Sequence, residues 1–167
     1  MHLILNHIKG SLKMRKKERE ITDISVMNGI IKRAKVMRLG LCDGPQPYVI
    51  PLNFGYEDNI FYFHCANEGR KLMVMKENPL VCIEVEGDVA ILPDPKGKAC
   101  AWSATYESII AFGSAEILTE VSEKRKGLAI IMKQYSDEQF EFGENSIKGV
   151  TVVRVAVKQM TGKSSKE

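Results

Sequence analysis

The sequence of 167 residues lacks several features that would assign it to a well-known class of protein. It has no apolar run near the roughly 20 residues that a membrane-spanning helix needs. The start, "MHLILNHIKGSLKMRKKERE", lacks the long apolar stretch and the small-residue cleavage site of a secretory signal. It also has no Gly-rich phosphate loop and no GxGxxG fingerprint, which argues against a Rossmann cofactor site. These absences predict a cytoplasmic protein that does not bind a membrane.

Catalytic and metal-binding motifs are equally scarce. There is no Ser/His/Asp triad, no paired-carboxylate site and no HExxH, and the three histidines are too far apart in sequence to form a metal centre with the cysteines. The four cysteines contain no CxxC pair, and Cys42, Cys65 and Cys82 lie in apolar strand patterns. We therefore expect buried, reduced thiols rather than disulfides or metal ligands.

The net charge of +3 comes from one short segment. Residues 9–19 contain six basic side chains and one acidic one, whereas the rest of the chain has 18 basic and 20 acidic residues. A basic arm can bind nucleic acid, but the slightly acidic remainder disfavours that alternative and we predict no nucleic-acid partner. We predict an N-terminal extension over residues 1–13, a single domain over residues 14–163 and a polar tail over residues 164–167.

Hydrophobic periodicity predicts a mainly β protein. Asp23 is placed to cap a helix over residues 24–34, and further helices are expected over residues 69–77 and from a cap at Ser122. Residues 88–99 hold two prolines and are expected to form a loop. The remaining apolar runs predict six strands: "VMRLGL", "YVIPLNFGY", "IFYFHC", "LVCIEVE", residues 102–118 and "VTVVRVAVKQM". Six strands in this order with peripheral helices predict an antiparallel barrel.

The run "YVIPLNFGY" alternates between large and small residues. One face is bulky and suited to a core, while the opposite face is small enough for a flat ligand to approach the backbone. The alternative is an edge strand, because Pro51 cannot donate a hydrogen bond to a neighbouring strand. The bulky face comprises Tyr48, Ile50, Leu52, Phe54 and Tyr56, and the small face comprises Val49, Pro51, Asn53 and Gly55.

The stretch "FHCANEGRKL" places two cations at the start of a predicted helix. Arg70 and Lys71 lie where the helix already presents positive charge and free N–H groups, so a bound anion such as a phosphate would balance the charge there. The alternative is an ordinary basic surface. His64, just before this position, is either a packed or surface residue, or a hydrogen-bond donor and general acid for a substrate.

A second candidate stretch contains the single tryptophan. Trp102, Ser103, Tyr106 and Ser108 combine aromatic surface with hydroxyl donors, which suits packing around a planar ring. An ordinary strand with aromatic anchors explains the same pattern.

Several segments together resemble the nitroimidazole-resistance (Nim-type) branch of the pyridoxamine 5′-phosphate oxidase-like flavoproteins. The resemblance runs from about Met14 to Lys163 and is carried by "EREITD", "RLGL", "PYVIPLNFGYEDNIFYFHCANEGRKLMVMKENPLVCIEVE", "AWSATYESIIAFGSAEI", "KRKGLAIIMKQYS" and "VKQMTGK". It implies a six-stranded antiparallel Greek-key FMN-binding split barrel. It also implies a homodimer with two FMN molecules in clefts between the subunits.

The resemblance implies roles for particular residues. Arg70 and Lys71 match the basic pair that holds the FMN phosphate, and His64 matches a histidine near the flavin and substrate. Two residues depart from the family pattern: Cys65 replaces a hydroxyl or small residue, and Glu107 replaces a basic one. The remaining matches are Cys65, Ala66 and Asn67 along the ribityl chain, Pro51, Leu52, Asn53 and Phe54 against the ring, Arg38 and Leu39 on the neighbouring strand, and Trp102, Ser103, Tyr106 and Ser108 near the flavin, contributed by the partner subunit.

The function implied is that of an FMN-dependent oxidoreductase. Electrons would pass from NADH or NADPH through FMN to a small-molecule acceptor, such as a 5-nitroimidazole, with His64 orienting or protonating that acceptor. The alternative is a flavin- or haem-binding protein without turnover, in which His64 would be an axial ligand.

Overall fold

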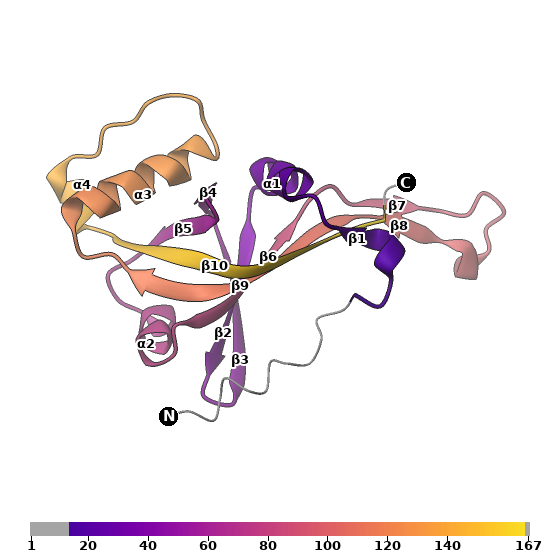
Figure 1. The fold of residues 1–167 in the computed structure, drawn as a ribbon, viewed down its shortest axis with the longest axis horizontal. Helices are drawn as coiled ribbons and strands as arrows, with labels where there is room; N and C mark the ends of the chain where they lie inside the picture. Colours follow the sequence, from indigo (N-terminus) through magenta and orange to yellow (C-terminus); the bar gives the residue numbers. More distant parts are fainter. Residues whose placement is uncertain (1–13, 166–167) are drawn as a thin grey trace.

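The computed structural model describes residues 14–165, so the predicted extension over residues 1–13 lies outside the described part. The described residues form one eight-stranded antiparallel sheet, one two-stranded hairpin and four α-helices (Figure 1). The helices are α1 (Ile24–Arg33), α2 (Arg70–Glu77), α3 (Val121–Lys133) and α4 (Glu144–Lys148). Among the described residues, no helix combines the length and the apolar character needed to span a bilayer.

The strands account for most of the remaining chain. The large sheet contains β1 (Glu20–Ile21), β2 (Met37–Asp43), β3 (Gln46–Leu52), β4 (Gly55–Glu57), β5 (Ile60–Cys65), β6 (Leu80–Glu86), β9 (Glu107–Ile117) and β10 (Thr151–Ser164), and the hairpin contains β7 (Ala90–Leu92) and β8 (Ser103–Thr105).

The large sheet closes into a split barrel. Its strand order is β3-β2-β6-β9-β10-β5-β4, with β1 paired to β10. β3 and β4 lie at opposite ends of this order, yet only Asn53 and Phe54 separate them in sequence. Three Cα–Cα steps span at most about 11 Å, so the two edges must lie close together and the sheet must curl. Within the described residues no hydrogen-bonded ladder joins β3 to β4, and the barrel is split there.

The predicted mainly β split-barrel fold is confirmed, but the predicted number of strands is wrong: the described residues form ten strands rather than six. The run "YVIPLNFGY" breaks at Asn53 and Phe54 to give two strands, and the predicted strand over residues 102–118 breaks at Tyr106. Residues 90–92 of the predicted loop pair with β8, and β1 adds a short strand. An interruption of one or two residues between strands leaves the alternation of side chains nearly intact, so hydrophobic periodicity does not reveal where one strand ends and the next begins.

The last strand is longer than predicted. It continues to Ser164, because Lys163 pairs with Ser108 of β9 and with Glu20 of β1. Most of the polar segment "TGKSSKE" is therefore sheet, since hydrogen bonding to two neighbouring strands offsets the low apolar content.

Two hydrophobic cores result from the alternation along β5. Phe61 and Phe63 point into the barrel, where they pack with Phe54 and with residues of α1 and α2. Tyr62 points the opposite way and packs with Val152 beneath α3 and α4. Each large side chain buried in this way contributes about 1.5–3 kcal/mol to folding.

The helix caps agree only partly with prediction. Asp23 caps α1 as expected, its carboxylate accepting a hydrogen bond of 2.7 Å from the Ser25 amide. The predicted cap at Ser122 is wrong, because α3 begins at Val121 and its N-cap is Glu120. Ser122 is already helical, which sequence spacing alone did not distinguish.

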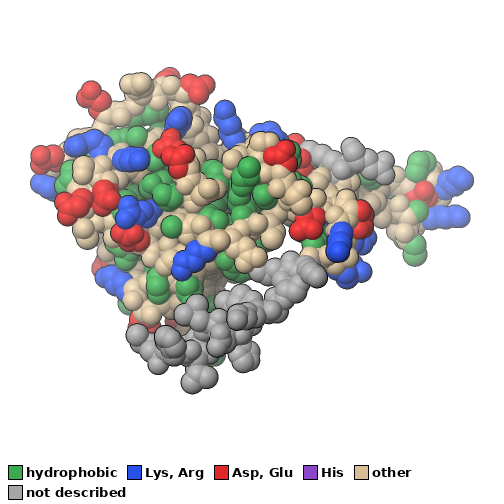
Figure 2. All heavy atoms as spheres, in the orientation of Figure 1, with side chains coloured by type: hydrophobic (Ala, Val, Ile, Leu, Met, Phe, Trp, Pro, Cys, Tyr) green, Lys and Arg blue, Asp and Glu red, His purple; other side chains and the backbone are tan. Residues whose placement is uncertain are grey.

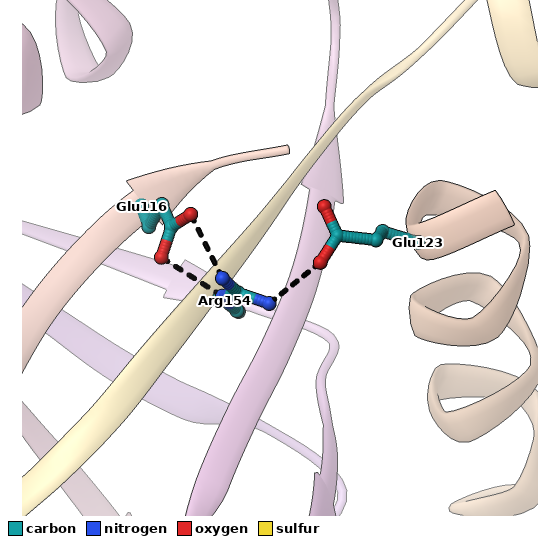
Figure 3. A network of polar contacts seen from close by, with 3 residues as sticks. All are labelled: Glu116, Glu123 and Arg154. Atoms are coloured by element: carbon teal, nitrogen blue, oxygen red, sulfur yellow. Dashed lines mark hydrogen bonds and ion pairs between the residues drawn. The ribbon is translucent and has the colours of Figure 1, made fainter. Parts of the chain in front are cut away.

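Arg154 joins three elements (Figure 3). On β10, its Nε and Nη2 donate to the two carboxylate oxygens of Glu116 on β9 at 2.9 and 2.8 Å. Its Nη1 donates to Glu123 on α3 at 2.9 Å. The guanidinium thus ties α3 to the sheet while remaining partly exposed.

The β7–β8 hairpin projects from the barrel as an arm (Figure 1). Ile91 is 62% exposed and Trp102 is 55% exposed. Figure 2 shows hydrophobic and basic side chains together on this protrusion. A two-stranded hairpin is only marginally stable by itself, and contiguous apolar exposure of this kind marks an interaction surface.

Candidate functional site

The N-terminus of α2 has the properties of an anion site. Gly69 precedes the helix with φ of 135°, a conformation that favours glycine, and space is open where a Cβ would stand. No side chain caps the helix there. The positive pole is therefore accessible, with Arg70 and Lys71 as its first two residues.

Arg70 is held in place by two contacts. Its Nε donates to Asp43 at 2.7 Å, and its guanidinium lies 4.4 Å from the centre of the Tyr48 ring. Both partners come from the β2–β3 hairpin, so α2 and the hairpin meet at this point. The bond to Asp43 uses Nε and leaves the two terminal nitrogens as donors for a phosphate.

The end of β5 sends successive side chains in opposite directions. Cys65 packs against the barrel core, whereas His64 is exposed on the other side of the sheet. Burial raises the pKa of the Cys65 thiol, and the nearby charge of Lys71 opposes this only partly. Cys65 is therefore a neutral thiol beside Lys71 near neutral pH.

Asn67 fixes the loop between β5 and α2. Its Nδ2 donates to the Lys148 carbonyl at 2.9 Å, and its Oδ1 accepts from the Thr151 hydroxyl at 3.0 Å. Both ends of this amide are used within the protein. Asn67 thus holds the loop carrying Ala66 in place, and what it presents to a ligand is backbone.

The predicted small face of the hairpin opens on a hollow. Arg38 and Pro51 are register partners on the outward side of β2 and β3, and β3 is an edge strand, as the alternative interpretation held. Because Gly40 has no side chain, the surface there is recessed. The hollow is about 450 Å³ and is lined by Arg38, Gly40, Val49, Cys82, Glu84 and Glu86.

Arg38 is balanced by acidic neighbours at this hollow. Its Nη1 donates to Glu84 at 2.9 Å and its Nη2 lies 3.5 Å from Glu86. The hydrogen bond to Glu84 raises the pKa of Arg38. Arg38 therefore adds little net positive charge to the hollow.

The segment linking β3 to β4 departs from the predicted pattern. Phe54 is fully buried in the barrel core, so only its backbone is available to a ligand. Gly55, assigned above to the ligand-facing side, instead packs against α3: a Cβ there would lie 2.4 Å from the Ile130 carbonyl oxygen. Leu52 packs against the core, and Asn53 is exposed at the split.

The third predicted group lies at the base of the arm, around Tyr106. The Tyr106 hydroxyl accepts a bond of 3.2 Å from Arg19, and Lys163 lies 5.4 Å from the centre of its ring. Hydrogen bonds from these two cations lower the pKa of Tyr106. Trp102 and Ser103 lie further out on the arm.

Glu107, the second departure from the family pattern, faces inward. It is only 9% exposed and accepts a hydrogen bond of 2.9 Å from Arg33 of α1. Its charge is thus directed at α1, whereas its neighbour Ser108 points outward beside Glu86.

The structure brings some of the predicted residues together and separates others. Cys65, Ala66, Arg70 and Lys71 share the corner between β5 and α2, while Arg38 and Pro51 share the outward face of the hairpin. Trp102, Ser103 and Tyr106 belong to the opposite side of the molecule, where the arm leaves the barrel (Figure 1). Within one chain, these groups of residues do not line a single cavity.

The predicted burial of the cysteines is partly wrong. All four are free thiols, but Cys42 and Cys100 are exposed, and Cys65 and Cys82 are half-buried. Cys42 lies in an apolar run, yet it alternates with Leu41 and so faces outward on β2. No group of ligating side chains within residues 14–165 is arranged to hold a metal ion.

Comparison with known families assigns this architecture. A family model described as pyridoxamine 5′-phosphate oxidase matches residues 27–164. The chain belongs to the pyridoxamine 5′-phosphate oxidase family. No curated protein gives a significant match.

Solved structures that are similar to this chain include that of a proposed 5-nitroimidazole antibiotic resistance protein from Bacteroides thetaiotaomicron. It is 34% identical, with 87% of this chain and 86% of that chain covered and a TM-score of 0.78. The flavocytochrome Anf3 from Azotobacter vinelandii is 16% identical, with coverage of 93% and 73% and a TM-score of 0.80. A FAD- and haem-binding protein from Mycobacterium smegmatis is 15% identical, with coverage of 89% and 74% and a TM-score of 0.78. The last two comparisons establish a shared fold.

Three residues that shape the candidate site are not predicted by the sequence pattern. Asp43 and Tyr48 orient Arg70, and Tyr135 hydrogen-bonds the backbone between β3 and β4. Tyr135 lies 81 residues from its partner Phe54. No local pattern signals a contact over that separation.

Proposed function

We propose that this chain is a cytoplasmic FMN-binding oxidoreductase of the Nim type. It would pass electrons from NADH or NADPH to a small acceptor, a nitroaromatic such as a 5-nitroimidazole. The observation that carries the proposal is the uncapped N-terminus of α2, with Gly69, Arg70 and Lys71 arranged to receive a phosphate. The identity of 34% to a proposed 5-nitroimidazole resistance protein supports the choice of acceptor.

The residues present at this corner fit a flavin phosphate. The terminal nitrogens of Arg70 and the ammonium of Lys71 supply donors and charge, and the backbone at Gly69 allows close approach. Cys65, Ala66 and Asn67 would border the ribityl chain, and Pro51 to Phe54 would border the ring. FMN, when bound, supplies hydride chemistry between a nicotinamide and an acceptor.

A homodimer completes the proposed site. An apolar row crosses the outward face of the barrel, where Val49, Gly40, Cys82 and Phe112 are register partners in turn. Val49 is 63% exposed and Phe112 is 37% exposed. A second copy of the chain covering this face would exclude water from it.

The second copy would also supply the residues that one chain holds elsewhere. Trp102, Ser103, Tyr106 and Ser108 lie on the arm or near its base, and the arm projects beyond its own barrel (Figure 2). Reaching across the two-fold axis, they would meet the hairpin and α2 of the partner. The site would then lie at the subunit interface.

The first test is flavin binding. Purified protein is stripped of chromophore and titrated with FMN, following the quenching of flavin fluorescence. Arg70→Gln and Lys71→Gln are each expected to weaken binding about tenfold or more, since a charge-assisted hydrogen bond contributes about 1.5–3 kcal/mol. Lys76→Gln, at the opposite end of the same helix, is the matched control and should bind as wild type.

Three outcomes would contradict the proposal in different ways. Wild-type protein that takes up no FMN would exclude the cofactor. Equal affinities for all three variants would place the phosphate elsewhere. A Soret band in the purified protein would favour the haem-binding alternative, with His64 as the candidate ligand.

The second test is turnover. Nicotinamide oxidation is followed with a 5-nitroimidazole as acceptor, comparing wild type with His64→Ala and His64→Gln. We expect His64→Ala to slow acceptor reduction while FMN remains bound, because exposed His64 would orient or protonate the acceptor. The glutamine keeps a donor and should restore part of the rate. Unchanged turnover in His64→Ala would remove that role.

A further inference from the structure

Tyr135 lies at the split of the barrel, just beyond the C-terminal end of α3. Its hydroxyl accepts a hydrogen bond of 2.9 Å from the Phe54 amide and donates one of 2.9 Å to the Lys35 carbonyl. Asn53 Nδ2 lies 3.4 Å from the same hydroxyl. Lys35 precedes β2 and Phe54 follows β3, so one side chain joins the two ends of the β2–β3 hairpin.

The neighbouring residue, Gln134, holds the other side of this junction. Its Nε2 lies within hydrogen-bond distance of the carbonyl oxygens of Ile31, Lys32 and Ala34, at 2.9, 3.2 and 3.1 Å. These carbonyls lie at the C-terminus of α1, where a helix leaves acceptors without partners. Gln134 therefore keeps the end of α3 beside α1, which keeps the Tyr135 hydroxyl at the hairpin.

The segment that Tyr135 contacts has no strand to hold it. β3 ends at Leu52 and β4 begins at Gly55, so the Phe54 amide is satisfied by a side chain instead of by a sheet ladder. Phe54 is fully buried, and a buried amide without a partner costs about 1–3 kcal/mol. Loss of the hydroxyl would therefore displace the segment.

We propose that Tyr135 is a positioning residue for the flavin site: it fixes the segment over residues 51–54 and thereby sets the affinity and the spectrum of the bound flavin. This inference rests on the proposed function. Tyr135 would act through the Phe54 backbone amide and the Asn53 side-chain amide, without itself touching the cofactor.

The test is Tyr135→Phe, with Tyr56→Phe as its matched control. Tyr56 also uses its hydroxyl in one hydrogen bond, to Asn59 in the β4–β5 turn, 2.9 Å away. Tyr135→Phe is expected to bind FMN about tenfold more weakly, the equivalent of about 1.4 kcal/mol, and to shift the visible absorption bands of the flavin. Tyr56→Phe should match wild type in both respects.

A second readout follows the segment without any cofactor. Hydrogen exchange of the Phe54 amide should be at least tenfold faster in Tyr135→Phe, whereas the β2 amide of Leu39 should be unchanged. If wild type takes up no FMN, the proposed function fails. The exchange rates then decide separately whether Tyr135 holds the segment.

Two results would overturn the inference. One is Tyr135→Phe protein with wild-type affinity and an unshifted spectrum. The other applies if Tyr135→Phe does not fold, in which case Gln134→Ala takes its place. Gln134→Ala frees the end of α3 from α1 but keeps the tyrosine hydroxyl, so we expect it to bind FMN two- to threefold more weakly. An unchanged FMN affinity in Gln134→Ala would contradict the role of Tyr135.

Discussion

Replacement of Gly55 by alanine tests how closely β4 approaches α3. An added Cβ would lie 2.4 Å from the carbonyl oxygen of Ile130, 2.5 Å from its carbonyl carbon and 2.6 Å from the Ile131 nitrogen. All three are backbone atoms within α3, which cannot rotate aside as a side chain can. Overpacking of a core costs about 1–3 kcal/mol, and we expect Gly55→Ala to lie at the upper end, near 3 kcal/mol.

The assay is equilibrium unfolding in urea, read as the change in midpoint at constant slope. A loss of about 3 kcal/mol is a large part of the 5–15 kcal/mol that stabilises a typical domain, so the transition should move well below that of wild type. Gly29→Ala is the control, because the nearest atom to its Cβ is the flexible Arg33 side chain at 3.6 Å. Within α1, that change should stabilise the protein by about 0.5–1 kcal/mol.

The two substitutions should change the free energy of unfolding in opposite directions. Coincident transitions for Gly55→Ala and wild type would show that α3 does not lie against β4 in solution. The second core and the position of Tyr135 at the split would then need another explanation.

Three further predictions concern charge and ionisation. Arg154→Gln should lower the free energy of unfolding by about 0.5–1.5 kcal/mol, since its ion pairs are partly exposed, and an effect that is insensitive to salt would contradict this. Burial raises the pKa of Cys65 and Cys82 above the ordinary 9.0, so the unfolded chain loses these protons first and stability should fall as the pH rises through about 9. Replacing both by alanine should flatten that decline, and an equally steep decline would refute the linkage. In an ultraviolet titration, Tyr106 should ionise before Tyr56 and Tyr62, because hydrogen bonds from Arg19 and Lys163 lower its pKa whereas burial raises theirs. Arg19→Gln should move the pKa of Tyr106 toward its ordinary value. An unchanged titration curve would exclude the Arg19 hydrogen bond.

Local pattern was sufficient for most of the elements. The apolar and aromatic run "IFYFHC" predicted β5, because such side chains favour strands, and in the structure both faces of that strand are buried, one in each core. Asp23 predicted the start of α1, because a capping carboxylate acts on amides two or three residues away. Pattern and resemblance together predicted Arg70 and Lys71 as candidate phosphate ligands.

Pattern was insufficient where a short break or a distant partner decided the outcome. The interruption at Asn53 and Phe54 is two residues long and keeps the period of a strand, so one strand was predicted where two exist. Gly55 was predicted to face a ligand, but its lack of a side chain instead allows the backbone of α3 to pack against β4.

By itself the sequence determined the strand periodicity, the helix that begins after Gly69 and the two cations that follow it, since each depends on neighbours within a few residues. Only the tertiary structure decided that β3 and β4 meet at a split and that Asp43 orients Arg70. The same holds for the hydroxyl of Tyr135, which closes the base of the hairpin. These contacts join residues 27 to 100 positions apart, and they exist only because the curled sheet and its packed cores bring those segments together.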